Sequence, residues 1–260
     1  EGRGNNNQFL QEAHTEKEVP ASALLYIMGV YIAEGSTTSG GGGNYSISIA
    51  QQKGGDAYGP TVTALHELGL SPHKKDDRII VHNKQLWAYI REEIPGSADE
   101  KRIPRWVLDL SQDNLESLFE GLIDGDGYRD STKYVYTTIS EGLANDVHEL
   151  SLKLGMAGRV TQEDAKTEEI KGTEYECSEK WRVHIRTKRL EPTVNHGHSH
   201  EQNGQTEEWE DYQGSVYCCT VPTHVLYVRR NGKAAWCGNT GRHGEKGIVS
   251  KILSDDEMLQ

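Results

Sequence analysis

The chain contains two stretches that read almost alike: IMGVYIAEG at residues 27–35 and FEGLIDGDG at residues 119–127. Apolar residues at i, i+3, i+4 and i+7 run into the second stretch from Leu115 onward, and Ser111 precedes them as a helix cap. Each stretch is therefore predicted to be the end of a helix that stops at a glycine.

Small residues recur at a spacing of four in both stretches, as Gly29 with Ala33 and Gly121 with Gly125. Residues four apart lie on one side of a helix, so each helix has a shallow strip where a partner backbone can approach closely. The two helices are predicted to pack on each other.

An acid stands immediately before the last glycine of each stretch, Glu34 in the first and Asp126 in the second. The end of a helix carries partial negative charge, so a carboxylate there is unfavourable and stability alone would not select it. A divalent cation between the two carboxylates would remove the repulsion, and acids that hold such a cation are suited to hydrolysing phosphodiesters.

With these acids and glycines, the pair of stretches resembles the two motifs of LAGLIDADG homing endonucleases. The resemblance implies an α+β fold of two pseudo-symmetric αββαββα-like halves, with the motif helices at their interface and the sheets forming a saddle over double-stranded DNA. It implies Mg²⁺ as cofactor, Gly29 and Gly121 as helix contacts, and a catalytic metal site made by Glu34, Asp126, Gly35 and Gly127. The alternative is a pair of amphipathic helices with glycine caps that only build a core.

The order of predicted elements repeats after each motif. Strand, helix and strand patterns follow the first motif at 45–49, 61–70 and 78–82, with a last helix at 85–94, and follow the second at 134–139, 143–154 and 181–185. We therefore place an endonuclease domain, expected to be monomeric, at 20–195, with halves at about 20–100 and 101–195. Residues 1–19 and 196–213 are polar and are interpreted as linkers.

The net charge of −12 at first argues against binding to nucleic acid, because affinity for DNA comes largely from Lys and Arg. Much of the acid, however, lies at 163–179 and 201–211, which we interpret as solvated loops. Basic residues in strand-like runs are predicted to contact DNA, although ordinary solvated surface is an equal alternative; they are Arg78, Lys84, Arg182, Arg186 and Lys188.

The segment KRIPRW at 101–106 joins the two halves and resembles the basic Ile-Pro block between the motifs of intein-borne endonucleases. Lys101 is the best candidate for a catalytic or phosphate-stabilising lysine, and Lys188 is a second candidate. A basic loop that leads into a helix is the alternative for Lys101.

A hairpin is predicted near the end of the chain, because Asn231-Gly232 is a strong two-residue turn signal between two strand-like runs. In that register Arg230 faces Lys233, and counting outward places His224 opposite Asn239. An Asn side chain can attack its own carbonyl and release the next residue, and an imidazole can assist near neutral pH.

Residues 214–239 resemble the C-terminal splicing blocks of an intein of the Hint type, with His224 as the block histidine, Asn239 as the cyclising residue and Thr240 as the first residue after the junction. Gly238 departs from the histidine usual before the terminal asparagine. Cys218 stands where Asp is common, either as an acid/base substitute or as a first thioester former. The resemblance implies a missing N-terminal intein segment as partner.

Residues 240–260, beginning TGRHGEKG, resemble the second-largest subunit of a multisubunit RNA polymerase, with a glycine-rich basic loop of another protein as the alternative. No membrane segment or signal peptide is visible, so a cytoplasmic protein is expected. The four cysteines lack metal-ligand spacing and are expected to be free thiols. A degenerate nucleic-acid-binding module and a polymerase fragment are the competing functions.

Overall fold

The computed structural model describes residues 16–40, 44–170, 173–188, 211, 213–215, 219–230 and 233–238. The chain divides into two compact units, Glu1–Lys188 and Arg189–Gln260, which are described separately. Among the described residues, no helix is both long enough and apolar enough to cross a membrane.

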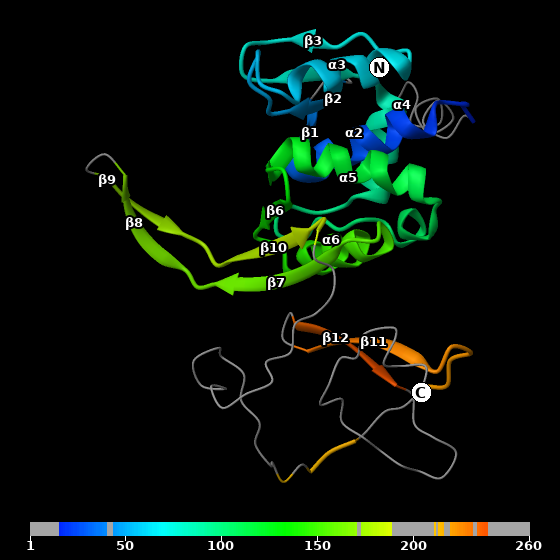
Figure 1. Ribbon diagram of the computed structural model, residues 1–260. Helices are drawn as coiled ribbons and strands as arrows, with labels where there is room; N and C mark the ends of the chain where they lie inside the picture. Colours follow the sequence, from blue (N-terminus) through cyan, green and yellow to red (C-terminus); the bar gives the residue numbers. More distant parts are fainter. Residues whose placement is uncertain are drawn as a thin grey trace. The chain divides into compact units, whose positions relative to one another are not determined.

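The first unit consists of two halves that follow the same order of elements (Figure 1). The first half comprises α2 (Ala21–Glu34), β1 (Gly35–Gly40), β2 (Asn44–Ile49), α3 (Tyr58–Glu67), β3 (His73–Lys74), β4 (Ile79–His82) and α4 (Lys84–Glu93). A 3-10 helix at Arg105–Asp109 joins the halves. The second half comprises α5 (Gln112–Asp126), β5 (Gly127–Arg129), β6 (Lys133–Thr138), α6 (Glu141–Lys153), β7 (Ala157–Glu163) and β10 (Lys180–Arg186). This repeat confirms the predicted α+β architecture.

Each half forms one four-stranded antiparallel sheet, in the orders β1-β2-β4-β3 and β5-β6-β10-β7. The two sheets also agree in register at their first strand pair. Gly35 pairs with Ile49 in the first half, and Gly127 pairs with Tyr136 in the second. The glycine that begins the first strand and the residue that pairs with it therefore occupy equivalent positions in the two halves.

Helices α2 and α5 lie side by side between the two sheets (Figure 1). A Cβ atom on Gly29 would lie 2.4 Å from the backbone oxygen of Leu118, and one on Gly121 would lie 2.2 Å from that of Tyr26. The predicted strip of small residues is thus the contact between the helices. Tyr26 Oη also donates a hydrogen bond of 2.8 Å to Asp124 Oδ2 across the pair.

Helix α2 is apolar on nearly all sides because protein surrounds it. Ile27, Met28 and Val30 are fully buried and belong to two core clusters, one shared with α5 and the second half and one confined to the first half. A helix with apolar residues all round is typical of the interior of a fold. The core therefore spans the interface and makes the two halves one unit.

The acidic region at 163–179 was expected to be a solvated loop, and this expectation was wrong. The structure forms β8 (Lys166–Ile170) and β9 (Thr173–Cys177), which pair antiparallel as a hairpin between β7 and β10. Figure 1 shows this ribbon running out from the body of the unit. Charged composition misled the prediction because a strand that projects away from the core needs no buried face.

Two smaller corrections concern the first half. Lys84 was expected in a strand-like run, but it begins α4, where the Asn83 side chain accepts a 2.8 Å hydrogen bond from the Leu86 amide and caps the helix. Strand β1 was missed because its sequence, GSTTSG, contains no apolar residue that could alternate with polar ones and has a glycine at each end. Pairing with β2, and not local propensity, makes it a strand.

Gly29→Ala is expected to lower the free energy of unfolding by about 3 kcal/mol, the upper part of the range for overpacking, because its methyl group would meet backbone that cannot move aside. Urea unfolding measures this change. Gly59→Ala in α3 is the matched control, since nothing lies within 4 Å of its added methyl group. Equal stability of the two variants would contradict the close helix contact.

The second unit contains one described hairpin, β11 (Val225–Arg230) with β12 (Lys233–Gly238). Arg230 pairs with Lys233 and Val225 pairs with Gly238, which confirms the predicted register of this pair of strands. Residues 216–218 and 239–260, and with them Cys218, Asn239 and Thr240, lie outside the described residues.

Candidate functional site

The two acids end their helices in the same way. Glu34 and Asp126 are the last residues of α2 and α5, and the glycine after each is extended, with φ −90° and ψ 150° at Gly35 and φ −93° and ψ 153° at Gly127. A Cβ atom on Gly35 would lie 2.1 Å from the Tyr31 ring, and one on Gly127 would lie 2.5 Å from the Ile123 Cα. Only glycine lets the chain pass from helix to strand there, so the acids are fixed at that point.

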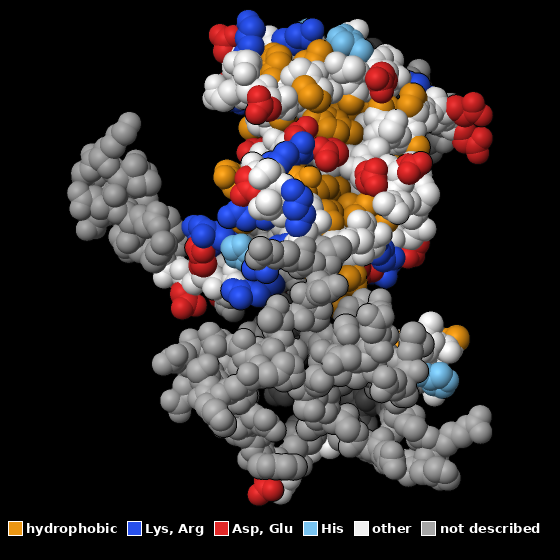
Figure 2. Space-filling model, in the orientation of Figure 1, with side chains coloured by type: hydrophobic (Ala, Val, Ile, Leu, Met, Phe, Trp, Pro, Cys, Tyr) orange, Lys and Arg blue, Asp and Glu red, His pale blue; other side chains and the backbone are white. Residues whose placement is uncertain are grey.

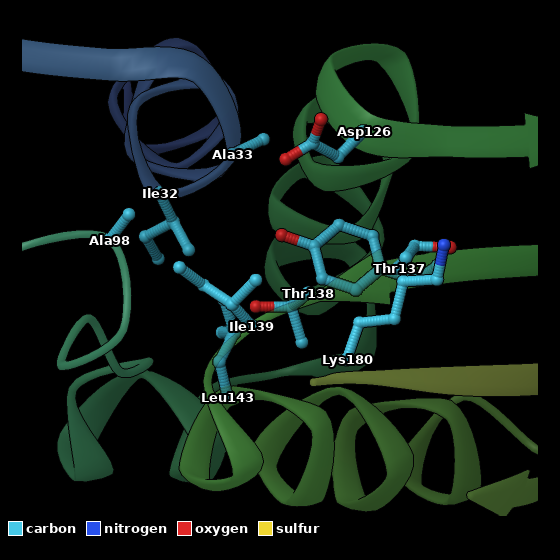
Figure 3. Close-up of a pocket in the computed structure, with 10 residues that line it drawn as sticks. Ile32, Ala33, Ala98, Asp126, Thr137, Thr138, Ile139, Leu143 and Lys180 are labelled. Carbon is cyan, nitrogen blue, oxygen red and sulfur yellow. The ribbon is translucent and has the colours of Figure 1, made fainter. Parts of the chain in front are cut away.

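The helix contact brings the two carboxyl groups together. A Cβ on Gly125 would lie 2.3 Å from the Ala33 Cβ and 3.8 Å from the Glu34 Cγ, so the ends of α2 and α5 touch. Figure 3 shows Asp126 at the end of α5, facing Ala33 on α2. Glu34 is half-buried, whereas Asp126 keeps an exposed side.

The pKa of Asp126 is raised from 3.8 to about 7, first by burial of its carboxyl group and then by the charge of Glu34 and a hydrogen bond with it. The charge of Lys101 acts in the opposite direction. Because Asp126 keeps exposed surface, we regard the charge and hydrogen bond of Glu34 as the firmer part of the cause. A hydrogen bond between two carboxyl groups requires that one of them holds a proton.

Without divalent cations, the contribution of Asp126 to the free energy of unfolding is expected to fall as pH rises from about 4 to about 7. In this window the Asp126 carboxyl group holds more protons in the folded state than in the unfolded state, because its pKa is higher in the folded state. Asp126→Asn should remove this slope, so the variant gains on the wild type as pH rises. Urea midpoints in EDTA measure the difference, and Glu116→Gln, on the exposed side of α5, is the control. A parallel pH dependence of wild type and Asp126→Asn would contradict the crowding.

Lys101 lies within electrostatic range of both acids and is only 5 % exposed. Its Nζ donates hydrogen bonds to the carbonyl oxygens of Tyr31 at 2.8 Å, Ile32 at 3.2 Å and Gly35 at 2.6 Å, and lies 4.5 Å from the Tyr31 ring centre. An ammonium group has three protons, so these three carbonyls use them all. Burial lowers the pKa of Lys101 to about 8, while the charges of Asp126 and Glu34 oppose this.

The geometry therefore favours Lys101 as the group that completes the end of α2, because a cation there offsets the helix dipole and satisfies free carbonyls. Contact with a phosphate would require it to leave these partners. The Gly35 carbonyl, which we expected to bind metal, already accepts a hydrogen bond from Lys101. A metal ion bound to the same oxygen would be repelled by the positive charge of the Lys101 ammonium group.

The carboxylates of Glu34 and Asp126 fit a hard divalent cation such as Mg²⁺. Such a cation is commonly held by one or two carboxylates while waters and substrate phosphates complete its shell. Among the described residues, no group of three or more His, Cys, Asp and Glu side chains gathers as a closed metal cage. The two carboxylates thus form an open metal site, and the substrate and water must supply the remaining ligands.

Basic side chains lie on the sheet face of the second half that is turned away from its core. Val183 and Ile185 of β10 are fully buried, so the residues between them point to the other face. By the same alternation and the register of the paired strands, this basic face contains Lys133, Arg159, Lys180, Arg182, His184 and Arg186. In Figure 2, Lys and Arg side chains gather where β7 and β10 lie in Figure 1.

The charges on the basic face act on one another. The pKa of His184 is lowered first by burial and then by the charges of Arg159, Arg182 and Lys133. Glu163 offsets part of the charge, since it pairs with Arg182 at 2.7 Å and with Lys180 at 3.6 Å. Arg182 and Arg186, both expected from sequence, lie on this face.

The corresponding face of the first sheet is different in chemistry. It carries hydroxyl and imidazole groups, namely Ser36, Thr38, Ser46, Ser48, His73 and His82. Arg78 lies just before β4 and pairs with Asp77 at 2.6 Å, while Lys84 lies 5.6 Å from the ring of Tyr45, on the helix side of the sheet. Lys84 is thus not brought onto this face, Arg78 lies beside it and is engaged by Asp77, and contact of either residue with DNA stays a prediction.

Lys180 is a site residue that the sequence reading missed. It lines a cavity beside Asp126, whereas Lys188 lies five residues beyond Val183, the strand partner of Tyr136. At about 3.3 Å per residue, that places Lys188 on the order of 16 Å along the strand from the acid end. The signal was present in the alternation of Lys180, Arg182 and Arg186, but the predicted strand began one residue too late.

In the second unit, His224 immediately precedes β11. Its φ of 55° places it in the left-handed region, and it is alone in this among the described non-glycine residues. The His224 amide donates a 3.1 Å hydrogen bond to the Val221 carbonyl. A non-glycine residue held in this region is strained, and such strain is concentrated at functional positions.

Comparison with known proteins gives relatives of unlike function. The chain is 28 % identical over 279 aligned positions to a "DNA-directed RNA polymerase subunit beta C-terminal section" of Stigeoclonium helveticum, covering 91 % of the chain and 26 % of that protein. It is 23 % identical to an "ATP-dependent Clp protease proteolytic subunit" of Chlamydomonas moewusii, covering 98 % of the chain and 35 % of that protein. A third match, 23 % identical, is an "Iron-sulfur cluster assembly SufBD family protein" of Mycobacterium leprae, with 51 % of the chain and 16 % of that protein covered.

Solved structures with a similar arrangement include mesophilic variants of the homing endonuclease I-DmoI, with a TM-score of 0.45, 14 % identity, 64 % of the chain and 90 % of that chain covered. Full-length DUF199/WhiA gives a TM-score of 0.39 with 10 % identity, 70 % of the chain and 57 % of that chain covered. These scores are too low to support a functional conclusion. Residues 113–190, which include most of the second half of the first unit, match the family model described as a LAGLIDADG-like domain.

Proposed function

We propose that the chain is a DNA endonuclease of the LAGLIDADG homing type, which cuts both strands of a long duplex site in the presence of Mg²⁺. The observation that carries this proposal is the contact between two helix ends, which brings the carboxyl groups of Glu34 and Asp126 so close that the charge of Glu34 raises the pKa of Asp126. Each acid belongs to one half, as a pair of cuts on two strands requires.

The chain's own residues have separate parts in this reaction. Glu34 and Asp126 would bind the metal ion and leave its remaining positions to the substrate and water. Lys101 binds the carbonyl groups at the end of α2 and so holds Glu34, the last residue of that helix, in place. The basic face positions the duplex through its phosphates. Bound Mg²⁺ would supply charge neutralisation at the phosphate and a more acidic water.

DNA binding by the basic face is expected to weaken steeply with salt. Replacing Arg182, Arg186 and Lys133 together by Ala should lower the slope of log K against log salt by about three units, roughly one per lost phosphate contact. Fluorescence anisotropy with duplex DNA in Ca²⁺ measures this. The control replaces Arg78 and Lys84, which lie off this face.

An unchanged salt slope in the triple variant would show that the face is wrongly placed. A larger decrease of the salt slope in the control than in the triple variant would show that the DNA instead contacts the first half near Arg78 and Lys84. Binding without any salt dependence would contradict DNA binding through phosphates altogether.

We further propose that this endonuclease is carried within an intein. The chain aligns with parts of three proteins whose names describe unrelated activities: transcription, proteolysis and iron–sulfur cluster assembly. In the first two, the aligned part is about a quarter and about a third of the whole protein. A segment found inside unrelated hosts is expected of a mobile in-frame insertion, which must be removed from the protein.

The second unit supports the splicing part of this proposal. Val225 pairs with Gly238, so a continued register would place His224 opposite Asn239. The strained backbone of His224 aims its side chain differently from a normal strand residue. We assign His224 as the acid/base group, Asn239 as the cyclising residue and Thr240 as the acceptor beyond the junction, with Cys218 as an acid/base or thioester residue and an N-terminal splicing segment as partner.

A polymerase fragment is the second candidate, and the match to the polymerase subunit over 91 % of the chain favours it. The nearly complete match to a protease subunit does not fit that candidate, because a polymerase domain has no reason to occur there. A module that binds DNA without cutting remains the other alternative. Incubation with duplex DNA and Mg²⁺ separates it from an endonuclease, because only the endonuclease produces cut strands.

A further inference from the structure

The two halves place their aromatic residues differently around the acids. In the first half, Tyr31 lies four residues before Gly35, and the strand partner of Gly35 is Ile49. In the second half, the equivalent positions before Gly127 and opposite it are Ile123 and Tyr136. The tyrosine therefore lies on the helix in the first half and on the strand in the second half. Total side-chain volume is therefore preserved, but the hydroxyl group sits in another place.

The two hydroxyl groups also differ in their partners. Tyr31 forms a side-chain hydrogen bond with Thr37. Tyr136 is fully buried, and its Oη has no hydrogen-bond partner among the described protein groups. A buried hydroxyl without a partner costs about 1–3 kcal/mol, and Phe would fill the same volume without that cost. Filling space alone does not explain a tyrosine at this position.

Tyr136 lines a cavity of about 190 Å³ beside the acids. Asp126, Thr138 and Lys180 supply polar groups to its wall, and α2 and α6 supply apolar side chains. Figure 3 shows Asp126, Thr138 and Lys180 around this space. Since a water molecule in a cavity takes roughly 30 Å³ and needs two to four polar partners, the cavity has room and partners for several waters.

The charges of Asp126 and Glu34 reach the hydroxyl of Tyr136. After burial, they are the causes that raise its pKa well above the ordinary value. Both carboxylates therefore lie within electrostatic range of the hydroxyl, and a hydrogen-bond donor there would be favourable for either of them. The equivalent position in the first half, Ile49, has no such group.

We propose that water held in this cavity joins the Tyr136 hydroxyl to the Asp126 carboxylate, so that Tyr136 is a positioning residue for one acid of the pair. The effect of this asymmetry on cutting rests on the proposed endonuclease function, whereas the bound water does not. The two strands of the DNA are then cut at unequal rates, because only one half holds its acid in this way.

The bound water is tested without any activity. A high-resolution crystal structure of the full chain in EDTA is expected to show ordered water at about 2.8 Å from Tyr136 Oη and a chain of one or two waters to Asp126. The Tyr136→Phe structure should lose the water nearest the ring. A dry cavity, or a direct bond from the hydroxyl to a protein group, would overturn the proposal.

The positioning is tested with duplex DNA labelled on either strand. Tyr136→Phe is expected to slow the cutting of one strand about tenfold and leave the other nearly unchanged, as loss of one hydrogen bond to a charged group implies. Tyr134→Phe is the matched control, since Tyr134 lies on the same face of β6 and packs on Phe119 with ring centres 5.2 Å apart.

An equal slowing of both strands, or no change, would overturn the positioning role even where the water is seen. A wild-type protein that cuts neither strand would overturn the endonuclease function, and the crystal structures would still decide whether the water joins Tyr136 to Asp126. The two failures are therefore distinguishable.

Discussion

Glu34→Gln and Asp126→Asn are each expected to lower the rate of Mg²⁺-dependent double-strand cleavage by about 10³-fold or more. Both replacements keep the shape of the side chain but remove a carboxylate that meets its partner at the helix ends. Metal-assisted stabilisation of a phosphoryl group is worth several kcal/mol, and about 1.4 kcal/mol corresponds to tenfold in rate.

The assay uses a supercoiled plasmid that contains the coding sequence of the host gene, joined without the segment that encodes the proposed intein. DNA binding by the two variants should change little, because the basic face lies on other residues. Glu116→Gln is the control, since Glu116 is exposed elsewhere on α5. Undiminished cutting by both single variants would show that the acid pair is not the hydrolytic centre.

Asn239→Ala is expected to abolish release of a peptide that begins at Thr240 when an N-terminal splicing segment is supplied in trans. No side-chain amide then remains to attack the backbone carbonyl. His224→Ala should slow the release by about 10²–10⁴-fold, the usual contribution of a positioned acid/base group. Gly238→His is expected to accelerate it.

Intact-mass spectrometry measures the released fragment and a succinimide at the new end. Thr223→Ala is the control for His224→Ala, because Thr223 adjoins it in the same turn and its hydroxyl only bonds the Val225 backbone. A fragment that starts elsewhere, or equal release from the Asn239→Ala protein, would show that the hairpin is not a splicing element.

These two predictions concern separate units of the chain. The acid pair belongs to Glu1–Lys188 and the hairpin belongs to Arg189–Gln260. Loss of cleavage in Asp126→Asn should therefore leave peptide release intact, and loss of release in Asn239→Ala should leave cleavage intact. Measuring both activities on each variant separates a specific effect from general misfolding.

The sequence by itself determined the helix pair and the acids at its end. Small residues four apart, followed by an acid and a glycine, are a local pattern, and such a pattern is visible in the sequence because all its residues lie within about two turns of one helix. The contacts of Gly29 and Gly121 and the register of the hairpin from Arg230 to Val225 follow that reading.

Only the tertiary structure decided which charges share a face and which groups surround the acids. Strand β1 exists because β2 pairs with it, and Lys84 lies off the sheet face because a helix begins there. Lys101 lies at the end of α2 across about 70 residues of sequence, and Lys180 reaches the cavity by Asp126 through strand pairing. Such long-range contacts depend on how whole elements pack, and no window of sequence contains both partners.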